Sequence, residues 1–167
     1  LGCLLQTQNS EDKELRFTDE DIIDEFITFF VAGMDTTGHS IAMMLYNLTQ
    51  HPQWLERLEK ERVQTFNTEK TVTADTLAKM DQLHNFMKET LRFHTPAMGV
   101  FGREAVKDHK LLDLNIRKGD MVRTSFFSIF QNETHFPEAQ KFNPDRFSNP
   151  ELASSDPYAF VPFSAGA

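Results

Sequence analysis

Apolar residues between positions 22 and 48 recur every three or four residues, which is the spacing of one face of an α-helix. The series is Ile22, Ile23, Phe26, Ile27, Phe30, Met34, Ile41, Leu45 and Leu48. Thr18 precedes three acidic residues and is typical of an N-cap, because its hydroxyl can accept from the first turn and the helix dipole favours acids there. We therefore predict one helix from about residue 18 to residue 50, roughly 50 Å long at 1.5 Å per residue.

The middle of this predicted helix contains residues that weaken helices. Gly33 costs about 1 kcal/mol against Ala, and Asp35 and Thr36 compete for backbone hydrogen bonds. Gly33 and Thr36 share a face with Ala32 beside them, so a flat or bulky group could approach the backbone there, with the Asp35 carboxylate one position away. Close helix packing through Gly33, with solvated polar neighbours, explains the same residues. Both interpretations stay open at this point.

Further along the chain, the pattern predicts shorter helices followed by extended segments. The predicted helices cover residues 53–66, 73–80, 81–93 and 124–130. Short extended segments between residues 97 and 123, with a turn at 118–120, indicate a small β-sheet. The run 132–162 carries five prolines among phenylalanines and predicts a structured loop pinned by aromatic side chains. The charged run 56–62 is interpreted as a solvated helix face.

Composition narrows the class of protein. A chain of 167 residues with 40% apolar content predicts a single domain, residues 1–167, with a real core. The net charge of −8 argues against a nucleic-acid partner. The longest apolar run is far short of the ~20 residues that a bilayer span needs. Because the chain begins at Leu1 and stops at Ala167 within a Gly-containing segment, we expect a fragment cut at both ends.

Cysteine and histidine offer no metal site. Cys3 is the only cysteine, so an internal disulfide is impossible, and its neighbours indicate an ordinary small apolar residue. The histidines show no repeated ligand spacing. We therefore assign no metal ligand within the chain.

Four motifs occur in an order that resembles the cytochrome P450 family. They are AGMDTT at 32–37, ETLR at 89–92 with Pro96 after it, FNPDRF at 142–147 and FSAG at 163–166. The resemblance covers about residues 17–167 and implies a partial cytochrome P450-like fold: mainly α with a small β-sheet and a proline-rich meander loop. It also implies that the long helix crosses the distal face of a haem.

The resemblance implies a fragment of a haem-thiolate monooxygenase that inserts one oxygen atom from dioxygen into a small, apolar organic substrate. Haem b would be the cofactor, and NADPH would supply electrons through a reductase partner. Family members of this style are anchored to the endoplasmic reticulum membrane by an N-terminal helix and face the cytosol. Two alternatives are a family member that isomerises or dehydrates peroxides, and a truncated, non-catalytic helical scaffold. Asp35 and Thr36 together argue against the peroxide chemistry, which needs no proton delivery.

The family's roles map onto the long helix residue by residue. Thr36 would orient oxygen and water over the iron, and Asp35 would relay protons from solvent. Ala32 and Gly33 would leave room for the porphyrin and dioxygen.

Other roles map onto the later motifs. Arg103 would bind a haem propionate, and Phe163 would open the haem loop and pack near the thiolate. Glu89, Arg92 and Arg146 would form a structural ion network that ties a helix to the proline-rich loop. Asp145 stands where the family more often has Glu.

The family's haem loop continues from Phe163 to the cysteine that ligates iron. By that motif the cysteine would lie three residues beyond Ala167, and Cys3 cannot replace it. We therefore expect the isolated chain to be catalytically inactive.

Overall fold

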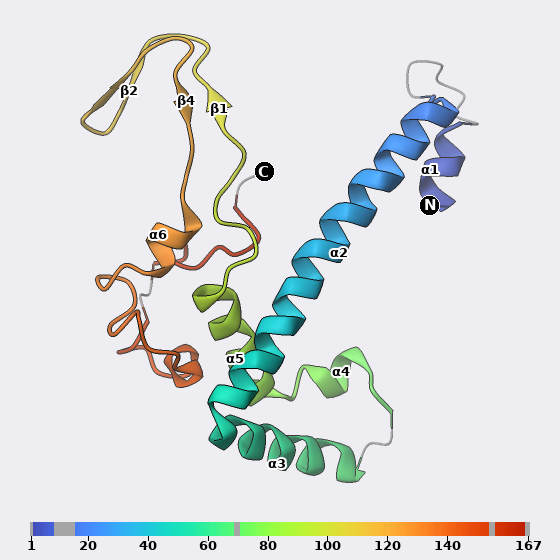
Figure 1. Cartoon of the computed structure of the whole chain (residues 1–167), viewed down its shortest axis with the longest axis vertical. Coiled ribbons are helices and arrows are strands. Elements are labelled where there is room, and N and C mark those ends of the chain that lie inside the picture. The colour runs from blue at the N-terminus through green and yellow to red at the C-terminus, as the bar shows by residue number, and fades with distance from the viewer. Residues whose placement is uncertain (1, 9–15, 69–70, 154–155, 166–167) are drawn as a thin grey trace. The chain divides into compact units, whose positions relative to one another are not determined.

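The computed structural model describes residues 2–8, 16–68, 71–153 and 156–165 (Figure 1). The chain forms two compact units, Leu1–His39 and Ser40–Ala167. The described elements are mainly helical, with small two-stranded sheets in the second unit. The predicted fold class is thus confirmed.

The first unit contains α1 (Gly2–Thr7) and most of α2 (Asp19–Gln50). Helix α2 is continuous through Gly33 and Thr36, as its apolar periodicity predicts. Its start is set by Thr18, whose hydroxyl accepts from the backbone N–H of Asp21 at 3.2 Å. The Asp21 carboxylate in turn accepts from the Thr18 backbone N–H at 2.8 Å and from its hydroxyl at 2.6 Å. This reciprocal cap satisfies donors that the first helical turn leaves without partners.

Helix α2 continues into the second unit and is followed by α3 (Pro52–Thr68), α4 (Ala74–Leu77) and α5 (Asp81–Phe93). Thr73 caps α4 through a capping box with Thr76. Helix α5 has no side-chain cap of its own at Met80. Instead the Glu61 carboxylate of α3 accepts the backbone N–H groups of Gln82 and Leu83, at 2.7 and 3.0 Å.

The expected solvated face at residues 56–62 is therefore only partly right. Glu56, Glu59 and Lys60 are exposed, but Arg57 and Glu61 are half-buried and bind other elements. A charge run on one helix cannot reveal such partners, because they lie on elements more than twenty positions away in sequence.

The predicted small sheet occurs as two antiparallel two-stranded ladders. Strand β1 (Arg103–Glu104) pairs with β4 (Met121–Val122), and β2 (His109–Leu111) pairs with β3 (Leu114–Ile116). The predicted turn before β4 is present, with Gly119 at φ 89°, a left-handed conformation that favours glycine. Gly99 forms a bridge with Ser125, and a Cβ at Gly99 would lie only 2.4 Å from the Thr124 carbonyl oxygen.

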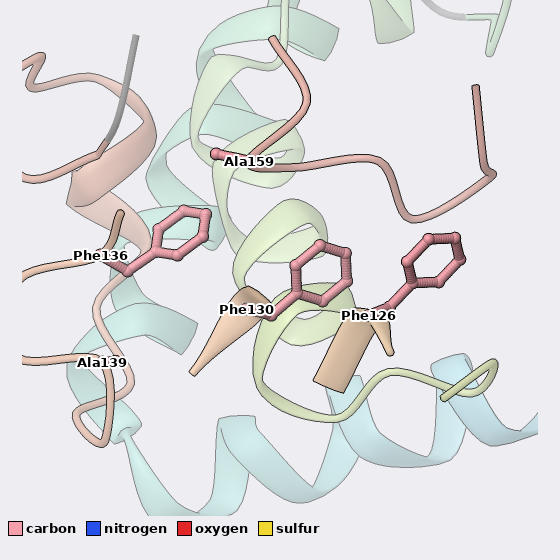
Figure 2. Close-up of a cluster of buried hydrophobic side chains, with 5 residues drawn as sticks. All are labelled: Phe126, Phe130, Phe136, Ala139 and Ala159. Carbon is pink, nitrogen blue, oxygen red and sulfur yellow. The ribbon is translucent and has the colours of Figure 1, made fainter. Parts of the chain in front are cut away.

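The core of the second unit is largely aromatic. Helix α6 (Phe126–Phe130), capped by Ser125, presents Phe126 and Phe130 to a buried cluster. Figure 2 shows their rings beside the segments that carry Phe136, Ala139 and Ala159. The rings of Phe126 and Phe130 stack with centroids 5.8 Å apart. The proline-rich segment is pinned by aromatics as predicted, and its described residues include a 3₁₀ turn, η2 (Pro144–Phe147).

The cap of α2 generates a pH prediction. Hydrogen bonds from Thr18 hold the pKa of the Asp21 carboxyl below its ordinary value. A group whose pKa is lower in the folded state stabilises above the unfolded pKa, roughly 3.9, and loses that contribution as pH falls through the folded value. We therefore expect the helical chemical shifts of residues 18–22 to decline below about pH 4 in NMR titrations. Asp21→Asn should weaken this turn at neutral pH and remove the step, whereas Asp24→Asn should leave it.

Candidate functional site

A buried carboxylate lies at the centre of the second unit. Glu89 on α5 is 0% exposed and accepts hydrogen bonds from Nε and Nη2 of Arg92, at 2.8 and 2.9 Å. It also receives Nε of Arg146 on η2 at 3.1 Å and the backbone N–H of Asn143 at 2.8 Å. Four donors thus converge on one carboxylate: two from Arg92 of α5, one from Arg146 of η2 and one from Asn143, the residue before η2.

The two arginines are buried and use their remaining N–H groups on backbone carbonyls. Arg92 donates to the carbonyls of Phe130 at 2.7 Å and Ala139 at 2.9 Å. Arg146 donates to those of Pro137 at 3.0 Å and Leu152 at 2.8 Å. Because these carbonyls belong to α6 and the proline-rich segment, the guanidinium groups hold that segment against α5.

The electrostatic balance explains why the network needs every member. Two guanidinium groups and one carboxylate leave a net positive charge in the interior, which the oriented carbonyl dipoles partly offset. Among the residues described by the structure, no buried side-chain nitrogen or oxygen lacks a hydrogen-bond partner. The structure thus brings the predicted residues Glu89, Arg92 and Arg146 together.

The site residues predicted on the long helix, α2, lie in the first unit. Ala32, Gly33, Asp35 and Thr36 are all exposed on α2. The Thr36 hydroxyl donates to the Ala32 carbonyl oxygen at 2.8 Å, within the helix. At Gly33 an added Cβ would meet no atom within 4 Å, so the backbone is open to a neighbour on that face.

Arg103 and Phe163 belong to the second unit. Arg103 is exposed on β1, in register with Val122 of β4. Phe163 is 86% exposed and lies in the turn that the bond from the Ser164 N–H to the Val161 carbonyl closes. Gly166, the final residue of the predicted haem-loop motif, lies outside the described residues.

Sequence reasoning missed the role of Asn143. Its side chain caps η2 by accepting the Asp145 backbone N–H at 3.1 Å, and its own N–H binds Glu89. The signal was present, because Asn followed by Pro is typical of the start of a helical turn. The partner of Asp145 was missed as well: it is Arg57, 88 positions earlier, and no local pattern could identify it.

The model of the cytochrome P450 family matches residues 1–167, which is the whole chain. This chain belongs to the cytochrome P450 family. Similar proteins include dog cytochrome P450 3A12 and human cytochrome P450 4F8, 31% and 36% identical over 99% of the chain. The chain spans about a third of the length of these relatives, 33% and 32% respectively.

Solved cytochrome P450 structures have the same fold. The chain superimposes on a zebrafish cytochrome P450 with progesterone at a TM-score of 0.82 and 22% identity, over 98% of this chain and 37% of that one. Retinoic acid-bound cyanobacterial CYP120A1 gives a TM-score of 0.82 at 26% identity, with the same coverage. These similarities identify the chain as a partial cytochrome P450 fold.

Family membership implies a haem by resemblance. In the first unit, a Cβ added at Gly33 would meet no atom within 4 Å, and in the second unit Arg103 is exposed. Within the described residues, no three His, Cys, Asp or Glu side chains are grouped to hold a metal ion. The one cysteine, Cys3, lies on α1, away from the predicted haem-loop motif in sequence.

The buried network generates a stability prediction. Glu89→Gln in the full-length protein should lower the free energy of unfolding by about 3 to 5 kcal/mol, because it leaves two buried guanidinium groups without a counter-charge. Chemical denaturation followed by circular dichroism measures the loss. The matched control is Glu138→Gln, which breaks an exposed pair with Lys141 and should cost about 1 kcal/mol or less. Equal costs for the two variants would contradict the importance of burial.

Proposed function

We propose that this chain is part of a haem-thiolate monooxygenase that uses dioxygen to insert one oxygen atom into a small, apolar organic substrate. Haem b, when bound, supplies the iron at which dioxygen is activated. The observation that carries the proposal is the placement of an acid and a hydroxyl, Asp35 and Thr36, beside the open backbone of Gly33 on one continuous helix. Family membership gives these residues their context.

The hydroxyl of Thr36 is proposed to orient water and the reacting oxygen. A threonine hydroxyl both donates and accepts, so it can pass a proton onward, and its bond to the Ala32 carbonyl fixes its direction relative to the helix. Because α2 is continuous through this position, the hydroxyl is held on a rigid element rather than on a loop.

Asp35 is proposed to carry protons from solvent to Thr36. It is exposed on α2, and it is adjacent in sequence to the hydroxyl it would serve. Ala32 and Gly33 are proposed to give clearance, since neither places bulk on that face.

In the second unit, Arg103 is proposed to bind a haem propionate and Phe163 to pack near the thiolate. Glu89, Arg92 and Arg146 are proposed to act in folding and haem incorporation rather than turnover.

Electrons are proposed to come from NADPH through a reductase, with the protein at the endoplasmic reticulum membrane. None of the helices that the structure describes combines the length and the apolar character that a membrane span requires. We propose that residues 1–167 form one part of a single catalytic domain, in line with the share of each relative that they cover.

The first test addresses proton delivery. Thr36→Ala in the full-length protein should lower the product formed per dioxygen consumed by about tenfold or more, because proton transfer by a positioned group contributes at least that much. Thr36→Ser keeps the hydroxyl and should retain most of the coupling, and Thr37→Ala serves as the matched neighbour. Unchanged coupling in Thr36→Ala would remove Thr36 from the mechanism. Turnover of peroxides without reductase would favour an isomerase or dehydratase.

The second test addresses the iron ligand. The coding sequence after Ala167 should specify a cysteine at the third position, and the reduced, carbon monoxide-treated full-length protein should show the long-wavelength absorption band of thiolate ligation. Another residue at that position, or a protein without the band, would contradict haem-thiolate chemistry and favour a scaffold.

A further inference from the structure

A second arginine–carboxylate fork lies on the outer side of η2. Nη1 and Nη2 of Arg57 on α3 donate to the two carboxylate oxygens of Asp145, at 2.9 and 2.6 Å. Nη2 of Arg57 also donates to the Gln82 side chain on α5. One guanidinium group therefore joins three elements: α3, α5 and η2.

The Arg57 guanidinium is held on a buried ring. It lies 3.8 Å from the ring centroid of Trp54, which is 4% exposed and packs against Phe86 of α5. The hydrogen bond to Asp145 also raises the pKa of Arg57 above its ordinary value. The Trp54 ring therefore restricts the Arg57 side chain, a restriction that an ordinary exposed surface pair lacks.

Two adjacent residues of η2 have opposite charges, and each binds a different helix. Asp145 pairs with Arg57 of α3, and Arg146 inserts its guanidinium between Glu89 of α5 and the backbone of the proline-rich segment. A short 3₁₀ turn has few hydrogen bonds of its own. These two side chains therefore help to set its position, together with the bond from the Asn143 backbone N–H to Glu89 and the contact of the Phe147 ring with Phe160.

We propose that Arg57 and Asp145 are positioning residues that hold η2 where Arg146 can reach Glu89. The Arg57–Asp145 fork holds η2 in place, and the hydrogen bond between Arg146 and Glu89 depends on that position. If the proposed haem-thiolate function is right, on which this consequence rests, the same fork also favours haem retention, because η2 precedes the predicted haem loop along the chain.

The first experiment measures how well η2 is held in place, as the rate of backbone amide exchange, by hydrogen exchange and mass spectrometry on the full-length protein. The backbone amides of Ser148 and Asn149 donate to the Asp145 carbonyl, at 3.0 and 3.1 Å, and report the turn. Arg57→Gln should speed exchange in the 143–149 peptide about threefold to tenfold while peptides from the centre of α5 stay protected. A chain that fails to fold would lose protection in both, and Asp145→Asn then provides a milder test.

The matched control is Arg62→Gln. Arg62 also binds a carboxylate on α3, Glu59, through Nε and Nη2 at 2.8 and 2.5 Å, but both partners belong to the same helix and are exposed. This variant should leave exchange of the 143–149 peptide within about twofold of the parent protein. Equal acceleration by Arg57→Gln and Arg62→Gln, or none by either, would overturn the proposal.

Conservative variants separate positioning from simple charge loss. Arg57→Lys keeps the charge but cannot form the fork, so it should accelerate exchange nearly as much as Arg57→Gln. In a double-mutant cycle, Asp145→Asn should add little once Arg57→Gln is present. Full additivity of the two changes, or complete rescue by Lys, would contradict the fork.

The haem arm uses the absorption band of the reduced, carbon monoxide-treated protein. Arg57→Gln should lower the fraction of purified protein that shows the band by about twofold or more, and Arg62→Gln should not. A parent protein without the band would refute the proposed function, while hydrogen exchange would still decide the fork. A normal band in Arg57→Gln, with unchanged exchange, would refute the fork alone.

Discussion

The second unit depends on one buried carboxylate shared by two arginines. Burying Glu89 is costly unless every donor around it is in place, and burying Arg92 and Arg146 is costly without Glu89. The arrangement is therefore cooperative: α5 supplies the acid and one base, η2 supplies the other base, and the backbone of the proline-rich segment accepts what remains. Specific electrostatics thereby hold in place a segment with little regular secondary structure.

The first unit follows a different principle. Helix α2 continues through Gly33 and Thr36 without a break, although Gly33 alone costs about 1 kcal/mol against Ala. The Thr36 hydroxyl finds its acceptor inside the helix, on Ala32. A residue type that disfavours helices is thus accommodated, and a polar group is presented beside an open stretch of backbone.

In the second unit, helix α3 supplies charged side chains that bind neighbouring elements. Arg57 and Glu61 lie one turn apart, and each replaces something that a neighbouring element lacks: Glu61 provides the missing cap of α5, and Arg57 provides an outer partner for η2. Charged side chains on an amphipathic helix therefore act as braces between elements and not only as a solvated face.

The sequence by itself determined the long helix, its capped start at Thr18, and the family motifs that mark Asp35, Thr36 and Glu89 as candidates. Periodicity and capping depend on residues close together in the sequence, so they can be predicted from the sequence alone. Only the tertiary structure decided that the strands form two ladders and that Arg57 meets Asp145 across 88 positions. Such pairings depend on how elements approach in space, and the free energy that selects them comes from burial and geometry rather than from neighbours in sequence.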